Sequence, residues 1–123
     1  MTDIAIEGFS SGRVFRLWHF AVSHSQLLIR SVRGEGDPAS KNLDLIFTGV
    51  YYMELVEVFA GLEIEKPTDD ELLRLQVRSG FKQDTGHKLY VLSSGGYRRY
   101  VGAASLRIQE NDLAPMQTSL GVL

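Results

Sequence analysis

The sequence contains no cysteine. Disulfide bonds, zinc sites built on thiolates and cysteine nucleophiles are therefore excluded together. The phosphate-binding patterns G-x-x-x-x-G-K-S/T and G-x-G-x-x-G are also absent, which removes the nucleotide-binding loops that those patterns form. We expect no cofactor.

Long apolar runs are missing as well. No stretch approaches about 18 consecutive apolar residues, and the N-terminal sequence MTDIAIEGFSSG lacks the basic flank and apolar run of a signal peptide. We therefore expect no membrane association and a cytoplasmic location. A length of 123 residues with 44% hydrophobic and 23% charged residues is typical of one globular domain. We predict a single domain over residues 1–110 and a loosely held tail over 111–123.

The net charge is only −2, but acidic and basic residues lie in separate blocks. The acidic block contains Glu54, Glu57, Glu63, Glu65, Asp69, Asp70 and Glu71. The basic block that follows contains Arg74, Arg78, Lys82, Lys88, Arg98, Arg99 and Arg107. Two interpretations stay open: the blocks neutralise each other across one surface, or the acidic block attracts a basic partner protein.

Alternating polar and apolar residues, separated by turn residues, predict antiparallel hairpins. The predicted strands are Asp3–Glu7, Val14–Val22, Leu27–Val32, Leu43–Thr48, Lys88–Leu92, Tyr97–Val101 and Ala104–Gln109. We expect the first two to form a hairpin through GFSSG. The second and third should form another through a four-residue loop around His24 and Ser25, because that turn has no glycine or asparagine. This register sets His19 opposite Arg30.

One helix is clearly marked, at residues 69–78. Thr68 and Glu71 have the spacing of a capping box, and Gly80 can end the helix. The stretch 50–64 is ambiguous, and we favour extended structure there because it is rich in β-branched and aromatic residues. The fold class is therefore mainly β (α+β): an antiparallel β-sandwich or half-open barrel built from hairpins, with one short capped helix.

Three groups of residues have the side chains of a reactive site, but their spacing or their surrounding sequence does not fit one. His19 and His24 are five positions apart, which suits neither a strand nor a helix as a metal-binding pair, so we expect no metal site. GFSSG resembles a nucleophile elbow around Ser10, but the strand-to-helix context that an elbow needs is missing. Paired carboxylates such as Glu54 with Glu57 are more typical of a solvated face than of acid–base catalysis.

The preferred hypothesis is a small non-enzymatic binding protein that acts through an acidic surface containing aromatic residues. The expected contact residues are Glu54, Glu57, Glu63, Glu65, Tyr51 and Tyr52. The partner would be a protein, in one version a basic enzyme that this chain inhibits, or a second copy of the chain. We expect no nucleic-acid partner, because Tyr97 and Arg99 face one way on a strand while Arg98 and Tyr100 face the other.

The alternative hypothesis is a β-barrel or sandwich that encloses a small ligand, with weak catalysis by histidine or glutamate. Its expected pocket residues are Trp18, His19 and His87. A closed apolar cavity lined by polar groups would favour this alternative, whereas a filled core would favour the interaction surface.

Overall fold

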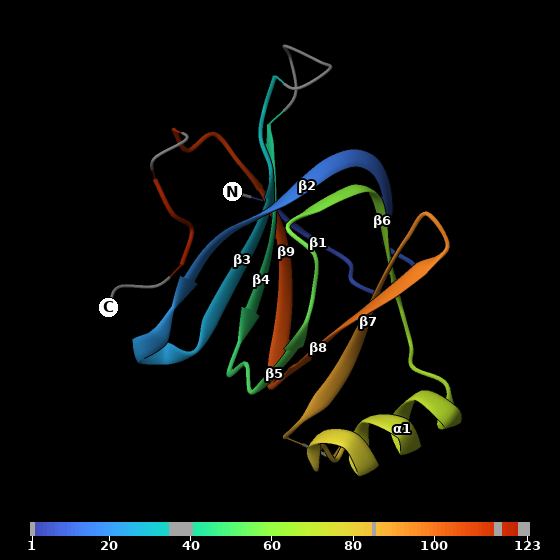
Figure 1. Cartoon of the computed structure of the whole chain (residues 1–123). Helices are drawn as coiled ribbons and strands as arrows, with labels where there is room; N and C mark the ends of the chain where they lie inside the picture. The colour runs from blue at the N-terminus through green and yellow to red at the C-terminus, as the bar shows by residue number, and fades with distance from the viewer. Residues whose placement is uncertain (1, 35–40, 85, 115–116, 121–123) are drawn as a thin grey trace.

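The computed structural model describes residues 2–34, 41–84, 86–114 and 117–120 (Figure 1). They form a nine-stranded antiparallel sheet and one α-helix. The strands are β1 (Thr2–Ile4), β2 (Ser10–Ala21), β3 (Gln26–Ser31), β4 (Asn42–Thr48), β5 (Tyr52–Glu54), β6 (Val58–Glu65), β7 (Lys88–Ser94), β8 (Tyr97–Ala103) and β9 (Ser105–Asn111). The helix α1 spans Asp69–Ser79, and a 3₁₀ turn spans Val22–His24. The predicted fold class is confirmed.

The sheet curls because two stretches of chain, 42–54 and 97–111, each form two consecutive strands that lie near opposite ends of the strand order. The strand order is β1-β9-β4-β3-β2-β6-β7-β8-β5, in which β4 pairs with β9 while its continuation β5 pairs with β8. Both stretches bend at the same level, where Gly49 (φ +67°) lies beside Ala104. A side chain at Gly49 would come within 2.9 Å of the Ala104 Cβ, so this close bend requires glycine. The result is a half-open barrel.

Aromatic and branched side chains fill the space inside the curled sheet. Phe15, Phe47 and Phe59 are almost completely buried there, and they pack with the inward-facing residues of β3, β4 and β9. Alternation along each strand places these residues on one face, as the sequence pattern predicts. The interior is therefore a packed core.

Two further apolar clusters lie on the outside of the sheet. One joins α1 to β7 and β8 through Leu75, Leu89 and Tyr100. The other joins Leu120, near the end of the described chain, to the outward-facing side chains of Leu28 and Ile46. The sheet is thus covered by a helix in one place and by the C-terminal segment in another (Figure 1).

The helix has the termini that the sequence predicts. The Thr68 hydroxyl accepts a hydrogen bond from the Glu71 N–H at 3.1 Å, and the Glu71 carboxylate accepts one from the Thr68 N–H at 2.9 Å. Gly80 adopts the left-handed conformation, and its N–H donates to the Gln76 carbonyl. The capping box is confirmed. The ambiguous stretch 50–64 is extended, because it contains β5 and most of β6.

The hairpin around His24 has the expected four-residue connection, Val22–Ser25, with Ser25 in the left-handed conformation. Its predicted register is wrong: His19 lies opposite Leu28, and Arg30 lies opposite Arg16. The connection is centred on Ser23 and His24, one residue earlier than predicted, because Ala21 pairs with Gln26, and this shifts the pairing by two positions. The irregularity between Leu17 and His19 shifts the pairs beyond it by one more position.

The prediction that the first two strands form a hairpin is also wrong. β1 pairs with β9, while β2 is paired on one side with β3 and on the other with β6. Phe9 explains the difference, because it enters the core and packs edge-on against Phe15 at 6.5 Å. Of the stretch GFSSG, only Gly8 and Phe9 therefore belong to the connection, while Ser10 and Ser11 already lie in β2 and pair with Glu63 and Leu62 of β6.

The part of the chain that the structure describes contains no helix long and apolar enough to cross a membrane. The predicted boundary between a domain over 1–110 and a tail over 111–123 stays a prediction. Within that tail, Asn111 still belongs to β9, and Leu120 is buried.

Candidate functional site

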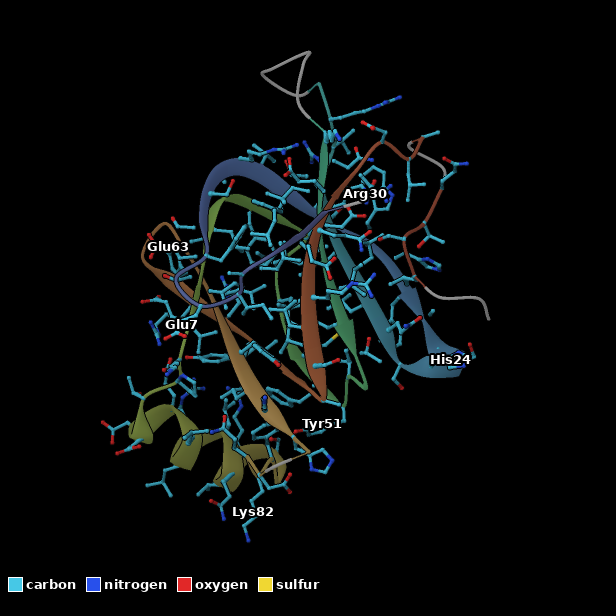
Figure 2. All side chains as sticks on the ribbon, turned by 180° about the vertical axis from the view of Figure 1, so that it is seen from behind. Glu7, His24, Arg30, Tyr51, Glu63 and Lys82 are labelled. Atoms are coloured by element: carbon cyan, nitrogen blue, oxygen red, sulfur yellow. The ribbon has the colours of Figure 1, made fainter. Side chains whose placement is uncertain are left out.

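Aromatic and charged side chains gather where the β4–β5 connection meets the α1–β7 connection. We call this group the Tyr51 surface; it consists of Tyr51, Tyr52, Glu54, Phe81, Asp84 and His87. Figure 2 shows Tyr51 at the end of the molecule that also carries Lys82 and the helix.

The ring of Tyr51 is held by a stack of aromatic groups. It lies parallel to Phe81, with ring centroids 5.3 Å apart, and forms a T-shaped pair with His87, with ring centroids 4.7 Å apart. Its backbone N–H donates to the Gly102 carbonyl at 3.0 Å. A side chain at Gly102 would come within 2.4 Å of the Phe81 ring, so Phe81 reaches this position only because Gly102 has none.

The loop before β7 positions His87. Asp84 and His87 exchange two backbone hydrogen bonds, and the Asp84 carboxylate contacts His87 Nδ1 at 3.0 Å. The same carboxylate accepts a hydrogen bond from the Gly86 N–H at 2.9 Å. The hydrogen bond with His87 is the largest cause that lowers the pKa of Asp84, and the bond from the Gly86 N–H lowers it further. Asp84 therefore carries a negative charge beside the aromatic stack at neutral pH.

The two tyrosines are hydrogen-bond donors at neutral pH. Burial, the Asp84 charge and Tyr90 raise the pKa of Tyr51 to about 12. Burial, followed by the bond from the Tyr52 hydroxyl to the Glu54 carboxylate at 2.8 Å, raises the pKa of Tyr52. Both phenols remain protonated and uncharged, which suits recognition better than nucleophilic or base chemistry.

Two hollows adjoin this surface. The smaller one, about 280 Å³, is lined by Tyr51, Tyr52, Phe81 and His87 among others. The larger one, about 690 Å³, lies between the β1–β2 connection, the start of α1 and β7. Its apolar lining residues are Ile6, Ile64, Pro67, Leu72, Leu89 and Tyr90, and its charged ones are Glu7, Glu65, Lys66, Asp69, Asp84 and Lys88. Asp84 lines both hollows, so the α1–β7 connection separates them.

Comparison of the chain with protein-family models, curated proteins and solved structures found no match. What this surface does has to be inferred from its geometry.

Four of the residues selected from the sequence meet at the Tyr51 surface: Tyr51, Tyr52 and Glu54 from the expected contact set, and His87 from the alternative pocket. The other three glutamates lie elsewhere. Glu57 and Glu63 are exposed, and Figure 2 shows Glu63 well away from Tyr51. Glu65 contacts Arg98 at 3.0 Å.

The acidic and basic blocks meet where α1 packs on β8. Arg98 contacts Glu71 through two hydrogen bonds, of 2.7 and 2.8 Å, and the Tyr100 hydroxyl donates to the same carboxylate. The Arg98 bonds are the largest cause that lowers the pKa of Glu71 to about 2. Arg78 approaches Glu54 at 3.6 Å. Several members of the acidic block are therefore neutralised within the molecule.

Trp18 and His19 lie in a different region, under the C-terminal segment. The Arg30 guanidinium lies 5.6 Å from the centroid of the Trp18 ring, and His19 Nδ1 is 3.4 Å from the Thr118 hydroxyl. His24 contacts Ser23 at 3.1 Å. No group of three or more histidine, aspartate or glutamate side chains suited to a metal ion occurs within residues 2–34, 41–84, 86–114 and 117–120.

Sequence reasoning missed Phe81 and Asp84. A signal for Phe81 was available, because an apolar residue just after a helix-ending glycine often packs back on the helix. Phe81 follows Gly80 and packs in the cluster under α1. The role of Asp84 depends on its contacts with Gly86 and His87, which only the folded loop shows.

Proposed function

We propose that this protein is a non-enzymatic binding protein that holds a basic partner protein through the Tyr51 surface. The observation that carries the proposal is the fixed, partly exposed ring of Tyr51 beside the Asp84 carboxylate. Tyrosine is among the residues that dominate protein interfaces, and a partner's arginine or lysine is attracted both by an aromatic face and by a carboxylate.

The rigidity of the surface supports this proposal. Phe81 and His87 already fix the Tyr51 ring, so binding would lose little side-chain entropy. The packed interior of the sheet also favours recognition at the surface over a ligand enclosed in the barrel.

The test compares two exposed tyrosines. Tyr51 is 45% exposed, and Tyr97, the first residue of β8, is 68% exposed. Immobilised wild-type protein, Tyr51→Ala and Tyr97→Ala would be used to capture proteins from source-cell lysate at low and moderate salt. We expect a basic protein that is retained by wild type and Tyr97→Ala, lost from Tyr51→Ala and weakened by salt. Equal capture by Tyr51→Ala would contradict the proposal.

Asp84→Asn tests the charge separately from the ring. It keeps the shape of the side chain but removes the negative charge beside Tyr51. We expect slower association and a weaker salt dependence than for wild type, measured by surface plasmon resonance with the captured partner. An unchanged association rate would assign the contact to the aromatic ring alone.

The larger hollow favours a second candidate function, the binding of a small ligand. Its volume of about 690 Å³ lies in the range of ligand pockets, and its apolar residues are accompanied by charged ones. A compound that raises the melting temperature of wild type, and raises it less for Lys88→Glu, which changes an exposed side chain of the lining, would support this function. Tyr51→Ala should leave that shift unchanged, which separates the two candidates.

A further inference from the structure

Two charged side chains on the outside of the sheet are completely buried. Arg30 and Asp44 lie opposite each other on β3 and β4, next to the pair Leu28 and Ile46. Their neighbours in sequence, such as Ile29, face the packed interior, so Arg30 and Asp44 face outward. An outer face normally meets water, yet both side chains are 0% exposed.

The C-terminal segment Gln117–Leu120 covers this face. The Gln117 carbonyl accepts a hydrogen bond from Arg30 Nη1 at 2.8 Å, and the Ser119 hydroxyl donates to the Asp44 carboxylate at 2.7 Å. Leu120 is buried with the outward-facing apolar residues of β2, β3 and β4. Figure 2 shows Arg30 on the side of the molecule where the C-terminal segment runs.

Arg30 and Asp44, the residues that the segment contacts, are also held by hydrogen bonds within the sheet. Arg30 binds the Asp44 carboxylate through two hydrogen bonds, of 2.7 and 2.9 Å, and the Asn111 amide donates to the same carboxylate at 2.7 Å. These three residues come from β3, β4 and β9. A buried ion pair contributes little net stability compared with apolar packing unless its remaining polar atoms are hydrogen-bonded, and here the segment supplies two of those hydrogen bonds.

The segment contacts the sheet in the way that a bound peptide would, without pairing with any strand. None of its described residues belongs to a strand. Its contacts are a backbone carbonyl on an arginine, a hydroxyl on a carboxylate and a leucine among apolar side chains. On the sheet, all three contacts are made to side chains, and none uses a backbone group that pairs the strands.

We propose that this outer face is a peptide-binding groove whose ligand is a Ser-Leu segment, supplied by the chain's own C-terminus and exchangeable with a free peptide of the same sequence. We call it the Arg30 groove; it consists of Trp18, Ala21, Leu28, Arg30, Asp44 and Ile46. It is separate from the Tyr51 surface, so its test does not depend on the proposed function.

Trp18 provides the readout, because it is the only tryptophan and packs against the cluster that contains Leu120. In Leu120→Asp, the new carboxylate would face apolar side chains, and the segment should leave the groove. We expect the Trp18 emission to shift to longer wavelength. Adding the peptide NDLAPMQTSLGVL should reverse the shift saturably, whereas the same peptide with aspartate in place of its leucine at position 120 should not.

Leu73→Asp is the matched control, because Leu73 is exposed on α1 and far from the groove in the fold. It should leave the Trp18 emission and the response to peptide as in wild type. Circular dichroism would verify that Leu120→Asp is folded. If the folded variant shows no shift, or if both peptides act alike, the groove is not an exchangeable peptide site.

Ser119→Ala keeps the test decisive if Leu120→Asp does not fold. It removes only the hydroxyl that binds Asp44, so the resident segment should exchange more readily. We expect Ser119→Ala to take up a fluorescently labelled copy of the peptide several-fold more than wild type does, measured by fluorescence anisotropy. Absence of uptake by Ser119→Ala would overturn the proposal.

Discussion

The outside of the sheet is covered in two places, and each cover is anchored at an arginine–carboxylate pair. Under α1, Arg98 belongs to the sheet and Glu71 to the helix, so the pair itself joins the two; their side chains are 32% and 12% exposed. Under the C-terminal segment, Arg30 and Asp44 both belong to the sheet and are 0% exposed, and the segment binds to a pair that already exists.

The two covering segments differ in how much of their structure is specified by their own sequences. Helix α1 has a capping box, a terminal glycine and an apolar side, so it is specified locally before it packs. The described part of the C-terminal segment has only two short local turns, closed by the Gln117 N–H on the Ala114 carbonyl and the Leu120 N–H on the Thr118 hydroxyl, and its position on the sheet comes from the groups that the sheet presents. Changes at the two pairs should therefore have different consequences.

The largest effect is expected at the buried pair. Asp44→Ala leaves the Arg30 charge buried without its partner, which should lower the free energy of unfolding by about 3–5 kcal/mol. Urea denaturation would measure it. The double variant Arg30→Met with Asp44→Leu should recover most of the loss, because apolar packing replaces the pair without leaving a charge. A stable Asp44→Ala protein would mean that water reaches Arg30.

A smaller, pH-dependent effect is expected at the helix anchor. Glu71→Gln weakens the bonds to Arg98, which should cost about 1.5–3 kcal/mol at neutral pH. The folded-state pKa of Glu71 is lowered from 4.5 to about 2, so its contribution is present above pH 4.5 and is lost as the pH falls towards 2.

Urea denaturation of wild type and Glu71→Gln at a series of pH values would measure this contribution. The difference between the two proteins should shrink between pH 4.5 and 2. A difference that stays constant with pH would show that the Glu71 charge does not hold the helix.

The next effect compares one threonine in each cover. Thr68→Ala removes the helix cap and should cost about 1 kcal/mol of unfolding free energy. Thr118→Ala removes a contact of 3.4 Å with His19 and the hydroxyl that accepts a hydrogen bond from the Leu120 N–H at 3.1 Å, so it should lower the free energy of unfolding by about 0.5 kcal/mol, less than Thr68→Ala. Thermal unfolding of both variants would rank them, and equal losses would show that the C-terminal segment is held more firmly than its contacts indicate.

The smallest effect is expected on the exposed side of the helix. Leu73 points away from the cluster under α1, so Leu73→Ala should change the free energy of unfolding by less than about 0.5 kcal/mol. A loss above 1 kcal/mol in urea denaturation, larger than surface sites usually show, would indicate that this side of α1 packs against something, such as a second copy of the chain.

Sequence reasoning found part of the candidate site. Tyr51 and Tyr52 were selected as aromatic residues next to an acidic block, and the structure places them with Glu54 and His87. It did not find that Arg98 binds Glu65, nor that Phe81 supports Tyr51. Both contacts join residues that are far apart along the chain, and alternation within one strand carries no information about them.

The sequence by itself determined the features that depend on neighbouring residues: the antiparallel class, the four-residue connection at His24 and the capped helix, because their hydrogen bonds and turn preferences act over a few positions. Tertiary structure alone decided that β1 pairs with β9, that Phe9 enters the core and that Arg30 and Asp44 are buried beneath the C-terminal segment. These outcomes depend on which surfaces remain uncovered after the sheet has formed, and burying those surfaces is a property of the whole chain.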